Sequence, residues 1–311
     1  LGILFALSLI FCFGFVFEAV QTNTIADTTK AAWGWDQHYV GVALVILTAP
    51  IIFGGIRRVS KAAEIIVPLM AVLYLVIALF IIATNISLIP DVFGQIFSNA
   101  FNFDSAAGGF LGGLISTTMM QGIKRGLYSN EAGMGSAPIA AAAAKTDHPV
   151  RQALVSMTGT FLDTIVVCSI TGIVLVMGLL GAGGEFVKPE LSGAALTTVT
   201  FQKMLPGIGG WIVTIGLIFF AYSTILGWCY YGEKCAVYVF GEKFAGLYRV
   251  GYVSSVMLGT VLSLDLVWLA SDTFNGLMAL PNLIALLLMA KVIVNETRDF
   301  KQKVKDGALP H

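Results

Sequence analysis

Long apolar stretches separated by short polar segments run along the whole chain of 311 residues. A membrane-spanning helix needs about 20 predominantly apolar residues, and this criterion predicts eight crossings. The predicted crossings are residues 1–21, 40–56, 64–86, 106–144, 152–181, 208–231, 248–264 and 273–290. We expect one membrane domain over residues 1–297, a solvated tail over residues 298–311, and a short surface helix over residues 194–205.

The fourth predicted crossing is too long for one straight helix and contains helix-breaking residues. Residues 129–138 read SNEAGMGSAP, which places an acid, two glycines and a proline in an apolar region. Irregular backbone at membrane depth is tolerated only where it is buried in protein or lines a cavity, so the interruption predicts a binding site of the kind found in transporters. Residues 119–122 (MMQG) are a second candidate break. The structural alternative is a tight turn in which Glu131 forms an ion pair with Arg125.

Composition supports an all-α membrane protein. Hydrophobic residues make up 57% of the chain and charged residues 12%, and the mean hydropathy is +0.86. The net charge of zero gives no indication of a nucleic-acid partner. The four cysteines show neither disulfide nor metal-ligand spacing. Because the chain opens with Leu1 inside an apolar run, residues 1–20 are interpreted as a crossing and an upstream part is expected.

The distribution of Lys and Arg predicts the orientation in the membrane. Alternate loops and the tail hold thirteen of these residues, whereas the other set of loops holds three, Lys30, Lys188 and Lys203. Loops rich in Lys and Arg face the cytoplasm. We therefore expect a multi-pass protein of the plasma membrane, in contact with its lipids, with the carboxyl terminus in the cytoplasm and Leu1 on the same side.

Polar residues at bilayer depth are the first candidates for function, because each is costly there unless it is paired or solvated. Asp163 lies near the midpoint of the fifth crossing, next to Thr164 and one turn from Thr160. These oxygen atoms suit a small cation such as sodium. A hydrogen bond between helices is an equal alternative.

The sixth crossing carries a second polar group at similar depth. Thr224 and Trp228 are four residues apart, so they share one helix face and could contact the same small ligand. Ser223 points in a different direction and could join an ion site. The simpler interpretation is that the hydroxyls bond to their own helix and that the indole fills a core. Gln21, at the outer end of the first crossing, could close a binding pocket or simply meet headgroups and water.

Enzymatic function is disfavoured. The sequence contains no Ser-His-Asp set, metal-ligand cluster, Walker A loop or glycine-rich dinucleotide fingerprint. All three histidines fall in predicted loops or the tail.

The interrupted segment also carries a family resemblance. Residues 125–140 (RGLYSNEAGMGSAPIA) and 145–152 (KTDHPVRQ) resemble the signature of the alanine or glycine:cation symporter family. Further matches at residues 20–23 and 222–234 extend the likeness over essentially the whole chain. The resemblance implies the amino acid-polyamine-cation fold, a leucine-transporter-like arrangement of two inverted repeats of five helices. The eight predicted crossings would be core helices three to ten, without the first two.

The same resemblance implies an activity and a site. The activity is uptake of a small neutral amino acid, alanine or glycine, coupled to sodium or to protons, with no obligatory protein partner inferred. The expected substrate-binding residues are Gln21, Gly133, Met134, Gly135, Thr224 and Trp228. The expected sodium-binding residues are Ala221, Ser223 and Thr224, together with Asp163 from its depth in the fifth crossing. The alternative is an amino-acid-binding receptor or channel-like protein without coupled transport.

Overall fold

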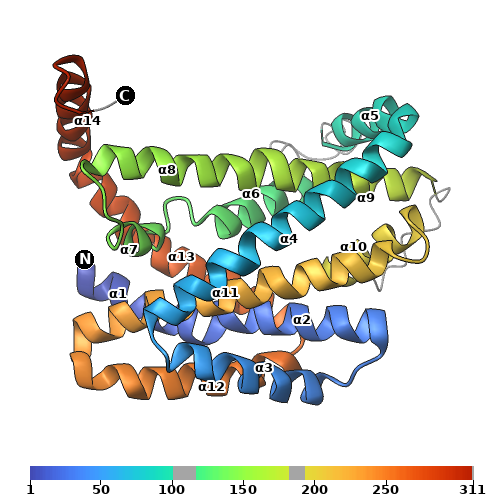
Figure 1. Ribbon diagram of the computed structural model, residues 1–311, viewed down its shortest axis with the longest axis horizontal. Coiled ribbons are helices and arrows are strands. Elements are labelled where there is room, and N and C mark those ends of the chain that lie inside the picture. Colours follow the sequence, from blue (N-terminus) through green and yellow to red (C-terminus); the bar gives the residue numbers. More distant parts are fainter. Residues whose placement is uncertain (101–116, 182–192, 310–311) are drawn as a thin grey trace, which may run out of the picture.

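The computed structural model describes residues 1–100, 117–181 and 193–309, and the regular structure within these ranges is helical, with no strand. The first long rod runs through α1 (Gly2–Phe11), a π-helical turn (Cys12–Val16) and α2 (Phe17–Trp33) without a break. A second rod joins α8 (Pro149–Phe161), a π-helical turn (Leu162–Cys168) and α9 (Ser169–Gly181). The other helices are α3 (Gln37–Ile52), α4 (Ile56–Thr84), α5 (Ile89–Ala100), α6 (Thr117–Asn130), α7 (Ala137–Ala141), α10 (Gly193–Met204), α11 (Gly209–Phe240), α12 (Ala245–Val261), α13 (Leu264–Leu288) and α14 (Ala290–Lys305). Figure 1 shows their arrangement.

Five helical segments of the described chain are long and apolar enough to cross a membrane: Gly2–Trp33, Arg58–Thr84, Pro149–Gly181, Gly209–Phe240 and Leu264–Leu288. Each matches one predicted crossing, and most extend beyond the predicted ends because capping and packing, which hydropathy does not report, set the last turns. The predicted crossings at 40–56 and 248–264 correspond to the shorter helices α3 and α12. The first part of the predicted crossing at 106–144 lies outside the described residues. A multi-pass helical membrane protein is therefore confirmed.

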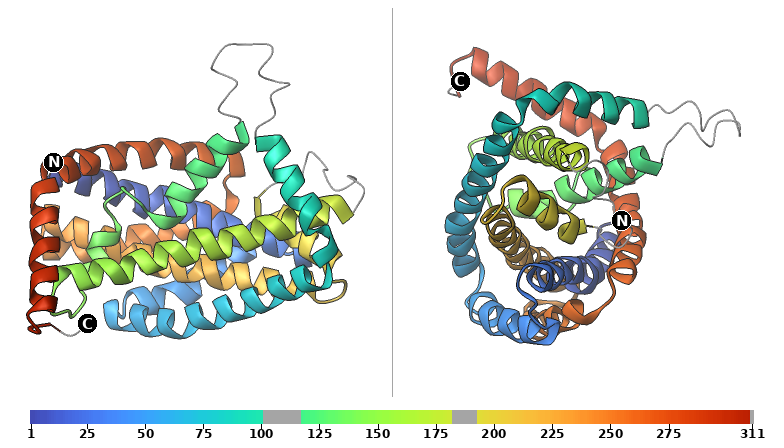
Figure 2. Two further views of the ribbon diagram at one scale, coloured as in Figure 1. Left: turned by 90° about the horizontal axis from the view of Figure 1, so that it is seen from above. Right: turned by 90° about the vertical axis from the view of Figure 1, so that its right-hand side faces the viewer.

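The long helices lie side by side, and α11 runs through the middle of the bundle (Figures 1 and 2). It contacts α1, α2, α4, α10 and α12. Its buried side chains, including Val213, Ile225, Leu226 and Trp228, belong to the apolar clusters that hold these helices together. Large aliphatic side chains such as Ile46, Val155 and Leu269 face outward. Outward aliphatic side chains with polar groups inside are the pattern that a lipid environment requires.

Two amphipathic helices lie at opposite ends of the bundle. Figures 1 and 2 show α14 running across one end, nearly at right angles to α8, and α5 at the other end. The short helix α10 matches the surface helix predicted over residues 194–205. Helix α14 spans the predicted boundary between residues 297 and 298, so the region predicted as a tail is largely helical, with no buried residue.

Candidate functional site

The helix break lies between α6 and α7. Helix α6 runs without interruption through residues 119–122 and ends at Asn130, so the break is at residues 131–136 and the second candidate position is helical. Glu131, Gly133 and Gly135 have φ angles of +52°, +77° and +88°. Glycine adopts this left-handed region without steric cost, whereas Glu131 does so only because its contacts hold it there. Pro138 stands at the start of the helix that follows the break, where proline is favoured.

The restarted helix is shorter than the sequence suggests. Helix α7 covers only Ala137–Ala141 and ends before the last residues of the alanine run. A helix of five residues carries few aligned peptide dipoles. This helix end therefore adds little positive potential to the site.

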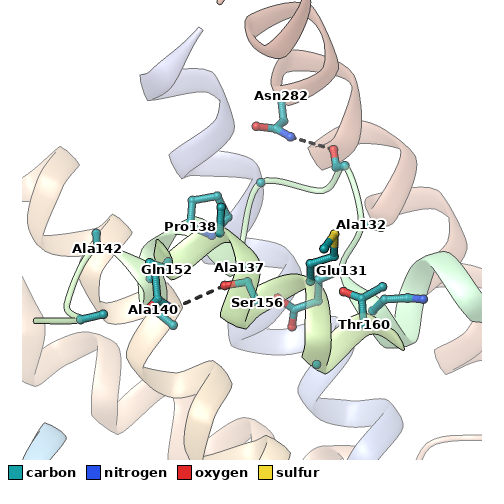
Figure 3. Close-up of a pocket in the computed structure, with 18 of the residues that line it drawn as sticks. Glu131, Ala132, Ala137, Pro138, Ala140, Ala142, Gln152, Ser156, Thr160 and Asn282 are labelled. Carbon is teal, nitrogen blue, oxygen red and sulfur yellow. Dashed lines mark hydrogen bonds between the residues drawn. The ribbon is translucent and has the colours of Figure 1, made fainter. Parts of the chain in front are cut away.

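Side chains from two other helices hold the break in place. On the α6 side, Ser129 Oγ donates to Asp163 Oδ2 at 2.7 Å, and Asn130 Nδ2 donates to Thr164 Oγ1. Both acceptors belong to the π-helical turn of the α8–α9 rod. On the other side, Asn282 Nδ2 of α13 donates to the carbonyl oxygen of Gly133 at 2.8 Å (Figure 3). One backbone group of the break, the Gly133 carbonyl, thus has a partner from outside α6 and α7, as membrane depth requires, and the other two bonds fix the end of α6 through its side chains.

Glu131 is the centre of the break. Its Oε1 accepts a hydrogen bond from Trp228 Nε1 at 2.7 Å, and its Oε2 accepts one from Ser136 Oγ at 2.6 Å. Trp228 is held in turn by Phe13, whose ring stacks on the indole with centroids 5.1 Å apart, and by the edge of Tyr128 at 5.8 Å. The carboxylate therefore ties the unwound segment directly to α11.

Arg125 is not the partner of Glu131, so the predicted ion pair of a tight turn is wrong. The Arg125 guanidinium lies 3.8 Å from the centroid of the Trp268 ring, and its Nη2 forms an ion pair with Asp272 Oδ2 at 3.1 Å. The reason is geometric: at the end of α6, Arg125 faces α13, whereas the positive φ of Glu131 turns its side chain toward α11.

Two cavities flank the break. The first, which we call the α2–α11 cavity, has a volume of about 710 Å³ and is lined by residues of α2, α6, α10, α11 and α13. The second, the α7–α8 cavity, has a volume of about 1050 Å³ and is lined by the broken segment, α7 and α8. Figure 3 shows Glu131, Gln152, Ser156 and Asn282 around this second cavity. Ser129, Glu131 and Tyr231 line both cavities, so the helix break is the wall between them.

The structure distributes the predicted site residues over these cavities. Gln21, Ala221, Thr224 and Trp228 line the α2–α11 cavity. Gly133, Gly135 and Asp163 line the α7–α8 cavity. The Met134 side chain is buried in an apolar cluster and lines a smaller cavity against α13. Ser223 is not among the lining residues of these cavities. Ala221 and Thr224 thus share a cavity, whereas Asp163 lies on the other side of the break, and the binding roles of all these residues stay predictions.

The hydroxyl hydrogens of Ser223 and Thr224 are already used within their own helix. Both Oγ atoms donate to the carbonyl oxygen of Phe220 at 2.9 Å. For Thr224 this leaves the oxygen lone pairs on the cavity side free to accept a proton donor or to coordinate a cation. Ser223 makes the same bond but does not line this cavity.

Sequence reasoning missed several residues that shape the site. Glu131 was considered only as the partner of Arg125, although an acid inside a helix break is itself a candidate. Tyr128 belongs to the signature at residues 125–140 but was given no role, although its hydroxyl accepts from Gln21 Nε2 at 3.3 Å and its ring contacts Trp228. Asn282 lies in the eighth predicted crossing, where an amide at membrane depth was a usable signal.

Fold and site together define a class: a multi-pass helical membrane protein with a broken helix between two cavities, the architecture of secondary transporters. A sequence profile of the sodium:alanine symporter family matches residues 1–311. The chain belongs to this family, and the resemblance of the signature residues is confirmed.

The names of similar proteins agree with this assignment. The chain is 54% identical over 308 residues to the sodium/alanine symporter AgcS of Methanococcus maripaludis, covering 99% of this chain and 66% of that protein. It is 39% identical over 311 residues to the probable sodium/glutamine symporter GlnT of Bacillus subtilis, covering 100% of this chain and 63% of that protein. It is 35% identical over 305 residues to a sodium/proton-dependent alanine carrier protein of a Bacillus species, covering 94% and 67%. The chain therefore spans about two thirds of the length of these relatives, which are transporters and not enzymes.

Proposed function

We propose that this protein is a secondary active symporter that takes up a small neutral amino acid, alanine or glycine, together with sodium. The observation that carries the proposal is the pair of cavities separated by residues 131–136 in a chain of this family. Alternating access needs a site that opens to one side at a time, with a movable element between the two openings. A break that side-chain hydrogen bonds tie to the α8–α9 rod, α11 and α13 is such an element.

The α2–α11 cavity is the proposed substrate site. Its volume falls within the range of roughly 300–1,000 Å³ common for small-molecule sites, and it combines the Trp228 indole with polar groups. The amide of Gln21 and the hydroxyl of Thr224 are suited to the ammonium and carboxylate of a zwitterion. Arg125 lines the same cavity with a guanidinium nitrogen, Nη1, that is buried and has no hydrogen-bond partner in the described chain, and it can attract the carboxylate.

For the coupling ion, we propose a site beside Ala221 and Thr224. The Thr224 oxygen has free lone pairs, and a hard monovalent cation prefers oxygen ligands. Asp163 is a less direct candidate, because it lines the opposite cavity and already accepts from Ser129. Sodium is favoured over the proton by the names of two of the three relatives, and one relative is described as dependent on both.

We further propose the inverted-repeat topology implied by the family, with α6 and α7 as its broken sixth helix and α11 as its eighth. The orientation with α14 in the cytoplasm agrees with the distribution of basic residues. The connections from α7 to α8, from α11 to α12 and from α13 to α14 lie at one end of the bundle (Figure 1). Lys145, Lys243 and Lys291 lie in these connections or directly beside them. On this orientation the α7–α8 cavity opens inward and the α2–α11 cavity opens outward.

Uptake of labelled alanine tests the proposal in proteoliposomes that contain the protein expressed from its complete gene. An inward sodium gradient should drive accumulation, and dissipating the gradient should abolish it. Trp228→Ala removes the indole between cavity and break and should reduce uptake at least about tenfold, as the loss of one buried hydrogen bond to a charged group predicts. Trp35→Ala, which removes an exposed indole, is the matched control. Binding of alanine without accumulation under any sodium or proton gradient would refute the symporter and favour a receptor.

A further inference from the structure

Glu18 is a fully buried carboxyl group that belongs to neither cavity. It lies in the first turn of α2 with an exposed fraction of 0%. Both of its carboxyl oxygens are inaccessible and without a hydrogen-bond partner in the described chain. An ionised carboxylate in such a place has lost its hydration and gained nothing in return, which is among the most unfavourable arrangements in a protein interior.

The hydroxyl groups beside Glu18 have backbone carbonyl acceptors of their own. The Thr22 and Ser255 hydroxyls lie within hydrogen-bonding reach of the Glu18 carboxyl group. Ser255 Oγ lies 2.8 Å from the carbonyl oxygen of Gly14 and 2.7 Å from that of Tyr252. Thr22 Oγ1 lies 3.2 Å from the carbonyl oxygen of Ala19. Each hydroxyl has a single hydrogen, and with that hydrogen given to a backbone carbonyl it can only accept from Glu18. A carboxylate cannot use an acceptor, whereas a protonated carboxylic acid can donate to one.

No cation compensates the charge of Glu18 in the part of the chain that the structure describes. The titratable groups that interact with it are the Cys229 thiol of α11 and the Tyr248 and Tyr252 phenols of α12, all neutral in their ordinary state. Arg249 of α12 already forms an ion pair with Glu233 of α11 at 2.6 Å, so its charge does not serve Glu18. From α2 itself only Thr22 is in contact, and α3, α10 and α13 bring no charged partner to this carboxyl among the described residues.

The packing around Glu18 also excludes water. Helices α2 and α12 approach so closely at Gly259 that an added Cβ would lie 2.7 Å from the Ala19 Cα. The side chains of Thr22, Ser255 and Tyr252 are buried as well. The π-helical turn just before Glu18 presents the Gly14 carbonyl to Ser255, and π-turns of this kind often mark functional positions.

Glu131 provides the contrast within the same protein. Two donors, the Trp228 indole and the Ser136 hydroxyl, converge on its two oxygens. Its surroundings therefore match an acceptor with a negative charge, whereas those of Glu18 match a neutral acid. Two acids whose environments favour opposite protonation states are the usual arrangement for proton-linked function.

We propose that Glu18 is a proton-binding site in the interface of α2, α11 and α12. Its carboxyl group is protonated in the packed arrangement and donates to a hydroxyl or carbonyl oxygen beside it. When α2 and α12 separate far enough to admit water, the proton passes from the carboxyl oxygen to a water molecule and leaves a solvated carboxylate. Any conformational change that opens this interface is thereby linked to the release of one proton. This inference does not depend on the identity of the transported substrate.

Infrared spectroscopy of the purified protein, expressed from its complete gene, tests the protonation state directly near neutral pH. The difference between wild type and Glu18→Gln should show the loss of one protonated-carboxyl C=O band and no change in the carboxylate bands. Glu131→Gln is the matched comparison and should remove a carboxylate band instead. If Glu18→Gln removes a carboxylate band, the proposal is overturned.

A second measurement uses the linkage between protons and stability. A folded state that holds one more proton than the unfolded state becomes less stable as the pH rises, and its unfolding equilibrium constant increases up to about tenfold per pH unit. Glu18→Gln should flatten the pH dependence by that slope near neutral pH, and an unchanged slope would contradict the proposal. If Glu18→Gln fails to fold, Ser255→Ala leaves the acid in place and removes one acceptor. The protonated-carboxyl band must then shift in frequency, and an unshifted or absent band would overturn the assignment.

Discussion

Trp228→Phe probes the hydrogen bond that joins α11 to the helix break. The substitution keeps an aromatic ring against Phe13 but removes the Nε1–H group that donates to Glu131 Oε1 at 2.7 Å. Glu131 then keeps only the Ser136 hydroxyl as a donor. A partly buried carboxylate that loses one of two donors is less well solvated, so both the stability of the break and its attachment to α11 should decrease.

The magnitude follows from the charge on the acceptor. A hydrogen bond to a charged group contributes about 1.5–3 kcal/mol, whereas the smaller ring also leaves unfilled space that costs a separate amount. A double-mutant cycle with Glu131→Met separates the two contributions, because the packing cost of the smaller ring is common to both backgrounds. We expect a coupling energy of about 1.5–3 kcal/mol between Trp228 and Glu131.

The assay is the free energy of unfolding of the four proteins in denaturant, followed for each by the initial rate of alanine uptake. Trp228→Phe should be clearly destabilising in the wild-type background and much less so when position 131 is methionine. Trp35→Phe, at an exposed position, should show no coupling to Glu131→Met. A coupling energy for Trp228 below about 0.5 kcal/mol, the usual error of additivity, would show that this bond does not hold the break.

Two further predictions concern the break and the end of the bundle. Gly135 has a φ of +88°, so Gly135→Ala should destabilise the protein in thermal unfolding by at least about 1–2 kcal/mol from the left-handed backbone alone. The added Cβ would also lie 2.7 Å from the Asn282 side chain. The control is Gly172→Ala in α9, where the added Cβ meets no neighbouring group within 4 Å, and it should be neutral or stabilising. Asp299 of α14 accepts hydrogen bonds from Lys303 and from His148, the residue that caps α8. These bonds lower the pKa of Asp299. Its contribution to docking α14 is therefore present above the ordinary pKa of about 3.9 and is lost as the pH falls through the lowered value. In the wild type, hydrogen exchange of α14 should rise only in strong acid. In Asp299→Asn it should already be faster at neutral pH. Equal exchange rates in the two proteins would contradict this prediction.

The sequence predicted the helical class and the position of the break because both depend on local composition. A run of apolar residues long enough to cross a membrane is visible without any knowledge of its neighbours. An acid, two glycines and a proline within ten residues indicate an interruption equally locally. The choice between residues 119–122 and 131–136 was decided by the structure, in which the second segment has residues at left-handed φ angles and the first is helical.

The partners across the break could not be predicted in the same way. Glu131 and Trp228 are 97 residues apart in sequence, and Ser129 and Asp163 are 34 apart. Hydropathy places such residues at similar depth but leaves their rotation about each helix axis undetermined. Asp163 illustrates this: its depth suggested a sodium ligand, but it faces the opposite cavity from Ala221 and Thr224.

The two π-helical turns show why rotation about the helix axis was the missing information. A π-turn inserts one extra residue into an α-helix and so rotates every later side chain relative to the earlier ones. The turn at Cys12–Val16 separates Phe13, which stacks on Trp228, from Glu18, which faces α12. The turn at Leu162–Cys168 directs Asp163 and Thr164 to the end of α6. Phe13, Asp163 and Thr164 thus lie within the π-turns and Glu18 directly after one, so the residues that contact the break and the buried acid lie where a regular α-helical repeat does not apply.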